Sequence, residues 1–305
     1  MKANMCAKHK WTGWTPITDC TITFCIMTLH RTAWLKRTLL SIQEYCPVPY
    51  TVKILSQGPP DRDLVDLLKN FDDRFELITS PINLGYGGGR RLLAELVRSK
   101  YTMMLDDDVY LTEGSIAIAL RVLERNADIG AVSMPLYDID GHMIGNGGRN
   151  ISIQNGIIHR RSLRLDFDKE WIEANDLSAG AMLYRTEMER CFSWDPESGY
   201  FEDLDKSLQI MRSSWKQVIV PRGRLIHDRS WFMTAASYRK VRFDGVYMYR
   251  SYKFVHKKWR LRFDLKTHLL FELVYPFLTL TKCLWLSSAF AWFLHKRAIQ
   301  HKVKY

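Results

Sequence analysis

The sequence contains no C-x-x-C pair, although it has six cysteines, at positions 6, 20, 25, 46, 191 and 283. This spacing argues against a zinc site, and we expect reduced thiols in a protein that faces the cytosol. The N-terminal stretch MKANMCAKHKWTGW has no apolar core, so we also expect no signal peptide. The sequence also lacks internal repeats and low-complexity linkers.

The composition is that of a folded protein with an uneven charge. With 305 residues, of which 47% are hydrophobic and 25% charged, the chain can build one large α/β domain with additions, or two modest domains. The net charge is +11, but the segment from Arg212 onward holds 20 Lys and Arg against 4 Asp and Glu. A mildly acidic body therefore carries a basic tail, which suits nucleic acid, an anionic membrane or an acidic substrate.

Apolar periodicity in the first half indicates strands that alternate with helices. Strands are predicted at 20–29, 50–56, 75–79, 101–105 and 129–134, and helices at 33–45, 61–71, 90–99 and 113–126. Such alternation implies an α/β fold with a mostly parallel, Rossmann-like sheet and flanking helices. Ligands of such sheets bind outside the carboxyl ends of the strands.

After Pro135 the pattern changes to short strands and irregular segments. We expect hairpins over 138–165, strands at 178–184 and 217–220, a short segment at 225–227, a helix over 202–213, and a basic, aromatic, helical chain from Trp231 onward. The predicted organisation is an N-terminal extension (1–19), a domain over 20–230 with halves 20–135 and 136–230, and a C-terminal extension (231–305).

Three consecutive carboxylates, Asp106, Asp107 and Asp108, follow the apolar run at 101–105. Like charges that close repel each other, and a divalent cation or a metal-bound diphosphate would offset the repulsion. Asp106 and Asp108 would point the same way from an extended segment and could share one ion. The alternative is a solvated acidic turn that caps the next helix.

The loop from Gly85 to Gly89 is a second candidate site, at the end of the third predicted strand. Glycines let a phosphate approach the backbone at a helix start, and Arg90 and Arg91 add charge suited to a diphosphate. The loop is neither G-x-x-x-x-G-K-[ST] nor the dinucleotide fingerprint. The alternative is a flexible turn.

Glu202, Asp203 and His227 complete the set of candidate residues. Glu202 and Asp203 begin a predicted helix after the aromatic residues Trp194, Tyr200 and Phe201. They fit either a general base in an aromatic pocket or ordinary capping of the helix dipole. A lone histidine such as His227 is more often packed or exposed than ligating.

Taken in order, these segments resemble glycosyltransferase family 2, the inverting nucleotide-sugar-dependent enzymes with the GT-A fold. The resemblance spans roughly Thr21 to Ser230. It rests on IMTLHRTAWLKRTLLSI, SPINLGYGGGRRLL, LDDDV, SAGAMLYRTEM and WDPESGYFEDLDKSLQIMRSSWKQVIVPRGRLIHDRS. It implies a hexosyltransferase-type enzyme that moves a sugar from a nucleoside diphosphate to a hydroxyl acceptor.

The resemblance also assigns residues. It implies that Asp203 is the catalytic base, with Glu202 as the fallback, and that Asp106, Asp108 and His227 hold Mn²⁺ or Mg²⁺. Residues matching the nucleotide-sugar site are Thr28, His30, Arg31, Ser56, Asn83, Gly85, Asp106, Asp107, Ser178, Ala179 and Gly180, to which the charge argument adds Arg90. Ser56 stands where the family usually has an aspartate that contacts uracil, so the nucleoside stays open. Arg91 and Gln209 also depart from the family pattern.

The basic and apolar tail, residues 231–305, indicates a membrane partner. Residues 269–294 could cross a bilayer by length, but Glu272, Pro276 and Lys282 interrupt them and both flanks are basic. We expect a cytoplasmic protein with peripheral or monotopic association to an anionic membrane through 231–305. One true span or a buried hairpin are the alternatives.

Function follows from the tail and the site together. A lipid-linked glycan fits as acceptor, in glycan, polysaccharide or glycolipid biosynthesis, and no nucleic acid is expected as a partner because no recognition motif is present. The alternative function is a non-catalytic nucleotide-sugar or nucleic-acid binding protein.

Overall fold

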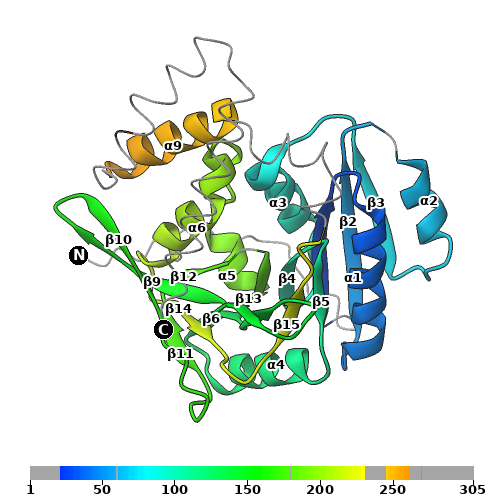
Figure 1. Ribbon diagram of the computed structural model, residues 1–305, viewed down its shortest axis with the longest axis horizontal. Coiled ribbons are helices and arrows are strands. Elements are labelled where there is room, and N and C mark those ends of the chain that lie inside the picture. The colour runs from blue at the N-terminus through cyan, green and yellow to red at the C-terminus, as the bar shows by residue number, and fades with distance from the viewer. Residues whose placement is uncertain (1–20, 60, 179, 231–244, 262–268, 270–305) are drawn as a thin grey trace.

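An eight-stranded sheet organises the computed structural model, which describes residues 21–59, 61–178, 180–230, 245–261 and 269. The strand order is β11-β14-β6-β13-β4-β1-β2-β3 (Figure 1). Its strands are β1 (Ile22–Thr28), β2 (Tyr50–Gln57), β3 (Phe75–Ser80), β4 (Tyr101–Asp106), β6 (Ile129–Ser133), β11 (Ile172–Ala174), β13 (Ala181–Arg185) and β14 (Lys216–Ile219). The predicted N-terminal extension lies outside the described residues.

Four of the five strands predicted for the first half pair in parallel, as the alternating pattern predicts. β1 pairs with β2 and β4, and β2 with β3, all in parallel, whereas β13 runs antiparallel between β4 and β6. In this register Thr28 is level with Ser56, and Met27 with Asp106. The carboxyl ends of β1, β2 and β4 therefore form one rim, and the predicted mostly parallel α/β fold is confirmed.

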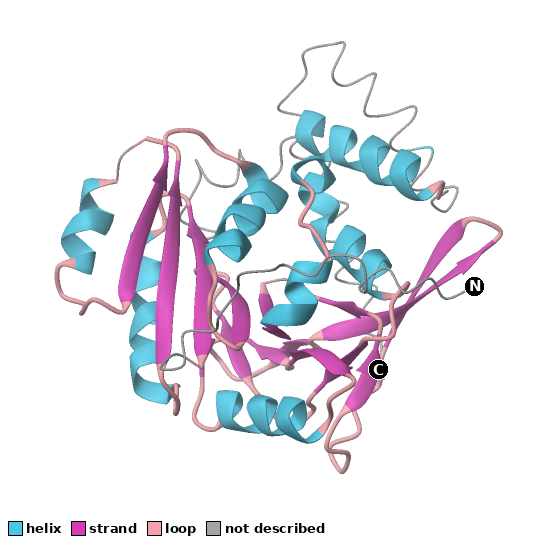
Figure 2. Ribbon diagram, turned by 180° about the vertical axis from the view of Figure 1, so that it is seen from behind, coloured by secondary structure: helices cyan, strands magenta, loops and turns pink. Residues whose placement is uncertain are grey.

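Helices cover both faces of this sheet, as Figure 2 shows. On one face pack α1 (Thr32–Tyr45) and α4 (Ser115–Arg125), and on the other α3 (Gly85–Leu96), α5 (Thr186–Cys191) and α6 (Glu202–Ile210); α2 (Arg62–Leu68) links β2 to β3. Side chains of β1 alternate between the two cores: Ile22, Phe24 and Ile26 face the α1 side, and Cys25 the α3 side. The helices of the first half match the predicted ranges, apart from α3.

Helix α3 begins at Gly85, five residues before the predicted start. Its glycines permit close packing. A methyl group at Gly87 would collide with the carbonyl oxygen of Asp195, and one at Gly89 with the sulfur of Met27. The expected phosphate-binding loop is thus the first turn of a helix whose glycines lie against the neighbouring backbone and strand.

Two small sheets flank the large one. One contains β5 (Val109–Leu111), β15 (Leu225–His227), β7 (Leu136–Tyr137) and β8 (Met143–Gly145), and the other β10 (Ile157–Ser162), β9 (Gly148–Gln154) and β12 (Asp176–Leu177). The β9–β10 hairpin turns at Asn155-Gly156, where both residues have positive φ. β15 pairs with β5 so that His227 lies opposite Val109, directly after the aspartates.

The described part of the C-terminal extension is helix α9 (Gly245–Trp259), which is helical as predicted. It packs on the 3-10 helix η2 (Pro196–Phe201), burying Tyr252 and Val255. In the part of the chain that the structure describes, no helix has the length and apolarity to cross a bilayer. Except for Leu269, the apolar stretch 269–294 lies outside it. Cys25 and Cys46 are free thiols, but Cys191 is disulfide-bonded, so the expectation of reduced thiols is wrong there.

Candidate active site

A buried arginine holds two of the three aspartates. The Arg31 guanidinium donates to both oxygens of Asp107, and its Nη1 donates to Asp108 Oδ2 at 2.8 Å. Thr28 Oγ1 also donates to Asp107 Oδ2, at 2.7 Å. Asp107 is fully buried and Arg31 only 5% exposed. In this arrangement Arg31 and Asp107 hold the acidic turn from within the protein, and they do not line the open rim.

Asp106 is the member of the triplet that faces the rim. Its side chain is 32% exposed, and its Oδ1 accepts a hydrogen bond from Arg90 Nη2 at 3.1 Å. Gly180 lies against the same carboxylate, so that any side chain at position 180 would collide with it. The turn at the end of β4 and the start of β13 therefore fit together only with a glycine at this position.

Arg90 links Asp106 to the carboxylates Glu202 and Asp203 at the start of α6. This arginine of α3 is 3% exposed, and its Nε lies 3.9 Å from Glu202 Oε1 at the start of α6. Its guanidinium stacks over the Trp194 ring at 5.5 Å, a cation–π contact. One buried positive charge thus stands between the rim of the sheet and the helix that carries Glu202 and Asp203.

Burial and mutual repulsion raise the pKa values of Glu202 and Asp203. Burial, followed by the like charge of Asp203, raises the pKa of Glu202 to about 8, and Arg90 opposes this shift. Burial also raises the pKa of Asp203 to about 6, against the effect of Arg90. Asp203 therefore ionises first, and near neutral pH it is the carboxylate able to accept a proton.

Asp203 also borders a charged pair on the small sheet. Arg149 of β9 and Asp176 of β12 form an ion pair, and Asp176 accepts a hydrogen bond from Ser207 Oγ at 3.0 Å. The charge of Asp176 raises the pKa of Asp203, whereas that of Arg149 lowers it. The hairpin thus contributes to the electrostatics of the candidate base.

Asp108 and His227 are arranged as two ligands of one cation would be. His227 Nε2 lies 3.5 Å from Asp108 Oδ1. Neighbouring ligands of an octahedral ion with bonds of about 2.1 Å lie about 3 Å apart. An imidazole nitrogen with a carboxylate oxygen is a donor set that suits Mn²⁺. The neighbouring Asp228 is buried and accepts hydrogen bonds from Arg37 and Tyr110 at 2.9 and 2.8 Å, which holds this end of β15 in place.

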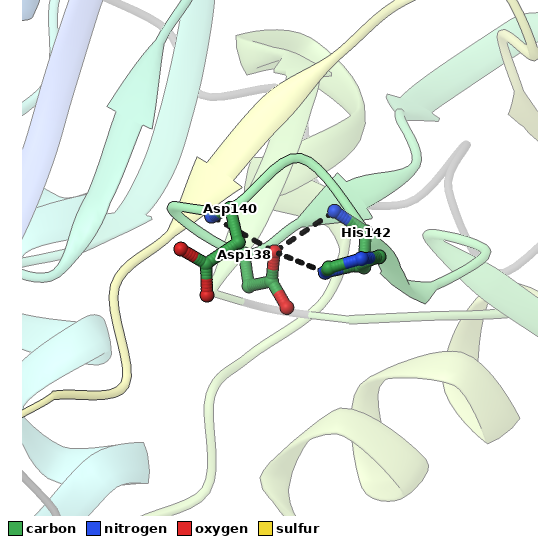
Figure 3. Close-up of side chains that lie close together, drawn as sticks. All are labelled: Asp138, Asp140 and His142. Carbon is green, nitrogen blue, oxygen red and sulfur yellow. Dashed lines mark hydrogen bonds and ion pairs between the residues drawn. The ribbon is translucent and has the colours of Figure 1, made fainter.

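Asp106 stands apart from that pair. Among the described residues, one group of at least three His, Cys, Asp or Glu side chains has all ligand atoms within 4.8 Å of one another, namely Asp138, Asp140 and His142 (Figure 3). Asp106, Asp108 and His227 do not form such a group. Asp138 Oδ1 accepts hydrogen bonds from the backbone of Asp140 and His142, so this acidic group stabilises the turn between β7 and β8.

The other predicted residues that the structure describes lie around the same rim. His30 is exposed, 3.9 Å from Asp61, and has a positive φ; Ser56 is buried at the end of β2. Asn83 Oδ1 accepts from the backbone of Gly85 at 2.9 Å, at the start of α3. Ser178 precedes β13, and Ala179 lies outside the described residues.

Sequence reasoning missed one polar contact and the way Arg31 is used. Gln57 Oε1 accepts from the backbone of Leu84 at 2.9 Å and so ties β2 to the start of α3. Arg31 lies in the segment that the resemblance assigns to the nucleoside, but its guanidinium donates its hydrogen bonds to Asp107 and Asp108. Burial of Arg31 and of the aspartates was not visible in the sequence, because the partners lie about 76 positions apart.

The sequence matches a known protein family. The family model for glycosyl transferase family 2 matches residues 23–192, which is more than half of the chain. The chain therefore belongs to glycosyltransferase family 2. A search of curated proteins finds no match. The matched range includes the aspartate triplet and Gly180 but ends before Glu202, Asp203 and His227, so the match does not bear on these three residues.

Membership of the family makes the protein a glycosyltransferase, with a nucleotide-sugar donor and an acceptor. Divalent metals are common in this family. The donor set at Asp108 and His227 is compatible with such an ion.

Proposed function

We propose that the protein is a metal-dependent, inverting glycosyltransferase of the hexosyltransferase type. The observation that carries the proposal is the position of Arg90, bound to Asp106 at the carboxyl edge of the sheet and 3.9 Å from Glu202 at the start of α6. This arrangement puts the donor-side carboxylate Asp106 and the start of the helix that carries the candidate base Asp203 on opposite sides of one buried charge. A sugar between them could be attacked from the side opposite its leaving group.

The donor side of the site is the rim of β1, β2 and β4. Thr28 and Arg31 hold the aspartate turn, and Asp106 is the exposed carboxylate on it. We assign Asp106, Gly180 and the loop around Asn83 to the sugar nucleotide. Ser56 at the end of β2 leaves the nucleoside open.

A divalent cation fits beside this rim. Asp108 and His227 would hold Mn²⁺ or Mg²⁺, with Asp106 joining after a side-chain rotation. When bound, the cation supplies positive charge that stabilises the leaving diphosphate. Arg90 supplies a second, permanent positive charge on the same side.

The acceptor side is the start of α6. Asp203 accepts the proton of the acceptor hydroxyl as the oxygen attacks the anomeric carbon. The C1–O bond to the diphosphate breaks in the same displacement and the configuration inverts. Glu202 retains its proton to higher pH and can donate a hydrogen bond to the acceptor.

The proposal extends to the acceptor, to the location of the protein in the cell and to the bounds of its catalytic domain. We infer a hydroxyl acceptor, such as a lipid-linked glycan, in glycan, polysaccharide or glycolipid synthesis, and a cytoplasmic protein peripheral to an anionic membrane through residues 231–305. The excess of Lys and Arg over Asp and Glu from Arg212 onward supports this location. The catalytic domain is taken as 20–230. A non-catalytic binding protein would have no need for two buried carboxylates with raised pKa values.

The experiment is a donor panel followed by product analysis. Thermal shifts with UDP-, GDP-, CMP- and dTDP-sugars, with and without Mn²⁺, identify the nucleotide. NMR of the glycoside formed, or of the sugar released by slow hydrolysis, then gives its anomeric configuration. Inversion and Mn²⁺ dependence support the proposal. Retention of configuration, or binding of a donor with no turnover in any assay, contradicts it.

A further inference from the structure

A groove of about 990 Å³ lies between α9 and η2. Arg250, Lys253 and Lys257 of α9 line one wall, and Pro196 belongs to the other. The three cations are spaced at i, i+3 and i+7, so they follow one face of the helix over about 10 Å. The groove is of a size that takes a small-molecule ligand.

The charge of this groove is positive. Its lining contains four basic side chains, the fourth being Lys258, against the two acidic side chains Asp195 and Glu197. Lys258 is occupied, because its Nζ lies 3.0 Å from Asp195 and 2.9 Å from Asp205. Arg250 and Lys257, both exposed, make no ion pair with any residue that the structure describes. Two cations are therefore available to an anionic ligand.

Apolar and aromatic surface accompanies the cations. Tyr249, Phe254 and Pro196 contribute to the same lining. The rings lie beside the lysines: Lys253 Nζ is 5.9 Å from the Tyr249 ring and Lys258 Nζ is 5.4 Å from the Phe254 ring. A ligand that matches both kinds of surface has an anionic group and an apolar part.

The groove is connected to the candidate active site. Lys258 and the Trp259 indole both bind the Asp205 carboxylate, at 2.9 and 2.6 Å, one turn into the helix that starts with Glu202. Tyr247, which also lines the groove, lies with its hydroxyl against Gly85 at the start of α3. A ligand in the groove would thus lie next to both helices that frame the site.

We propose that this groove binds the phosphate end of an amphiphilic acceptor, with Arg250 and Lys257 as its ligands and Tyr249 and Phe254 against its apolar part. The proposal rests on the proposed function and specifies its acceptor as a phosphorylated amphiphile. A planar membrane surface is a poorer occupant, because the cations line a hollow bounded by Pro196 and Glu197 on the opposite wall.

The test uses the full chain and a defined probe, dodecyl phosphate below its micelle concentration, measured by isothermal titration calorimetry. Dodecyl maltoside is the uncharged comparison and inorganic phosphate the comparison without a chain. The groove variant is Arg250→Gln/Lys257→Gln. The matched control, Arg62→Gln/Arg121→Gln, removes the same charge from exposed positions on α2 and α4. Circular dichroism checks that all three proteins are folded.

We expect wild type and control to bind dodecyl phosphate equally, and the groove variant to bind it at least about tenfold more weakly, since two charge-assisted contacts are lost. Dodecyl maltoside should not distinguish the proteins. Equal dissociation constants for groove variant and wild type would overturn the proposal. So would a variant that keeps dodecyl phosphate but loses binding to phosphatidylcholine vesicles with 30% phosphatidylglycerol, because the cations would then serve the membrane surface.

Donor binding is measured in the same samples. If no nucleotide sugar binds but dodecyl phosphate binds in the groove as expected, the proposed function fails while the phosphate site stands. If donors bind and turn over but the groove variant is indistinguishable from wild type, the groove proposal fails alone.

Discussion

Arg90 Nη2 lies 3.1 Å from Asp106 Oδ1, while Nε of the same guanidinium lies 3.9 Å from Glu202 Oε1. The contact joins two parts of the chain that are separated by 96 positions, the acidic turn after β4 and the start of α6. It makes the charge of Arg90 common to the proposed donor and acceptor sides of the site.

Replacing Arg90 should change the pH dependence of the reaction. Its charge lowers the pKa values of both Glu202 and Asp203. In Arg90→Gln we expect the acid limb of the kcat/KM profile to move to higher pH, along with a loss of kcat, because Asp203 will hold its proton longer. The control is Arg91→Gln, whose exposed side chain pairs only with Glu95 among the described residues. An unchanged acid limb in Arg90→Gln would contradict the role of the arginine.

Asp203 and Glu202 can be separated by isosteric amides. We expect Asp203→Asn to lower kcat by about 10²–10⁴-fold with little change in donor affinity, since general-base catalysis is typically worth that factor. Glu202→Gln should cost less, because Glu202 is largely protonated near neutral pH. Asp168→Asn, at an exposed position, is the control. If Glu202→Gln is the more damaged enzyme, the base has been assigned to the wrong carboxylate.

The same carboxylates predict how stability varies with pH. The pKa of Glu202 is raised by burial to about 8 from 4.5, so the folded protein binds its proton more tightly than the unfolded chain does. The contribution is complete below about pH 4.5 and is lost as pH rises to about 8. As pH rises from about 4.5 to about 8, the Tm of the wild type should therefore fall relative to the Tm of Glu202→Gln. Parallel Tm curves for the two proteins would show that the shift is absent.

Loss of Arg31 should destabilise the fold, beyond any effect on activity. Arg31→Ala leaves Asp107 and Asp108 buried without their guanidinium partner, which typically costs about 3–5 kcal/mol. Urea unfolding measures the change in free energy, and Arg62→Ala at an exposed position is the control. Arg31→Ala/Asp107→Asn should recover part of the loss, because one uncompensated charge is removed. A change in unfolding free energy as small as that of the control would contradict the burial argument.

The described residues offer two candidate Mn²⁺ sites: Asp108 with His227, and the group Asp138, Asp140 and His142. We expect Asp108→Asn and His227→Ala to weaken Mn²⁺ binding and abolish metal-stimulated turnover, whereas His142→Ala, in the exposed turn, should have no effect. Electron paramagnetic resonance titration of free Mn²⁺ gives the affinities. Full activity of the wild type in EDTA would remove the metal from the mechanism.

Much of the fold was predictable from local patterns. Runs such as CTITFCIMTL specify a strand buried on both faces, and the helices after each strand carry regular apolar spacing. The insertion of β13 between β4 and β6 was not predictable, because strand order depends on contacts between Leu105 and Ala181 that no local pattern records. The start of α3 was predicted too late, since glycines ordinarily break helices and here permit close packing.

The site was predicted in its residue types but not in its pairings. Charge repulsion made the aspartate triplet conspicuous, yet nothing in the sequence separates Asp106, which faces the rim, from Asp107, which Arg31 and Thr28 enclose. Similarly, Arg90 was expected at a diphosphate because of its neighbours in the chain. Its actual neighbours come from β4 and α6.

The glycine-mediated contact between α3 and η2 has a consequence for how this enzyme could be altered. No side chain separates Gly87 from the backbone of Asp195, so the two segments are in direct backbone contact, with no side chain between them that could change its rotamer. One segment borders the rim of the sheet and the other forms a wall of the groove beside α9. On the proposed assignment of donor and acceptor, reshaping one binding surface would displace the other, so changes of acceptor specificity are best sought at the exposed side chains of α9, which leave this contact intact.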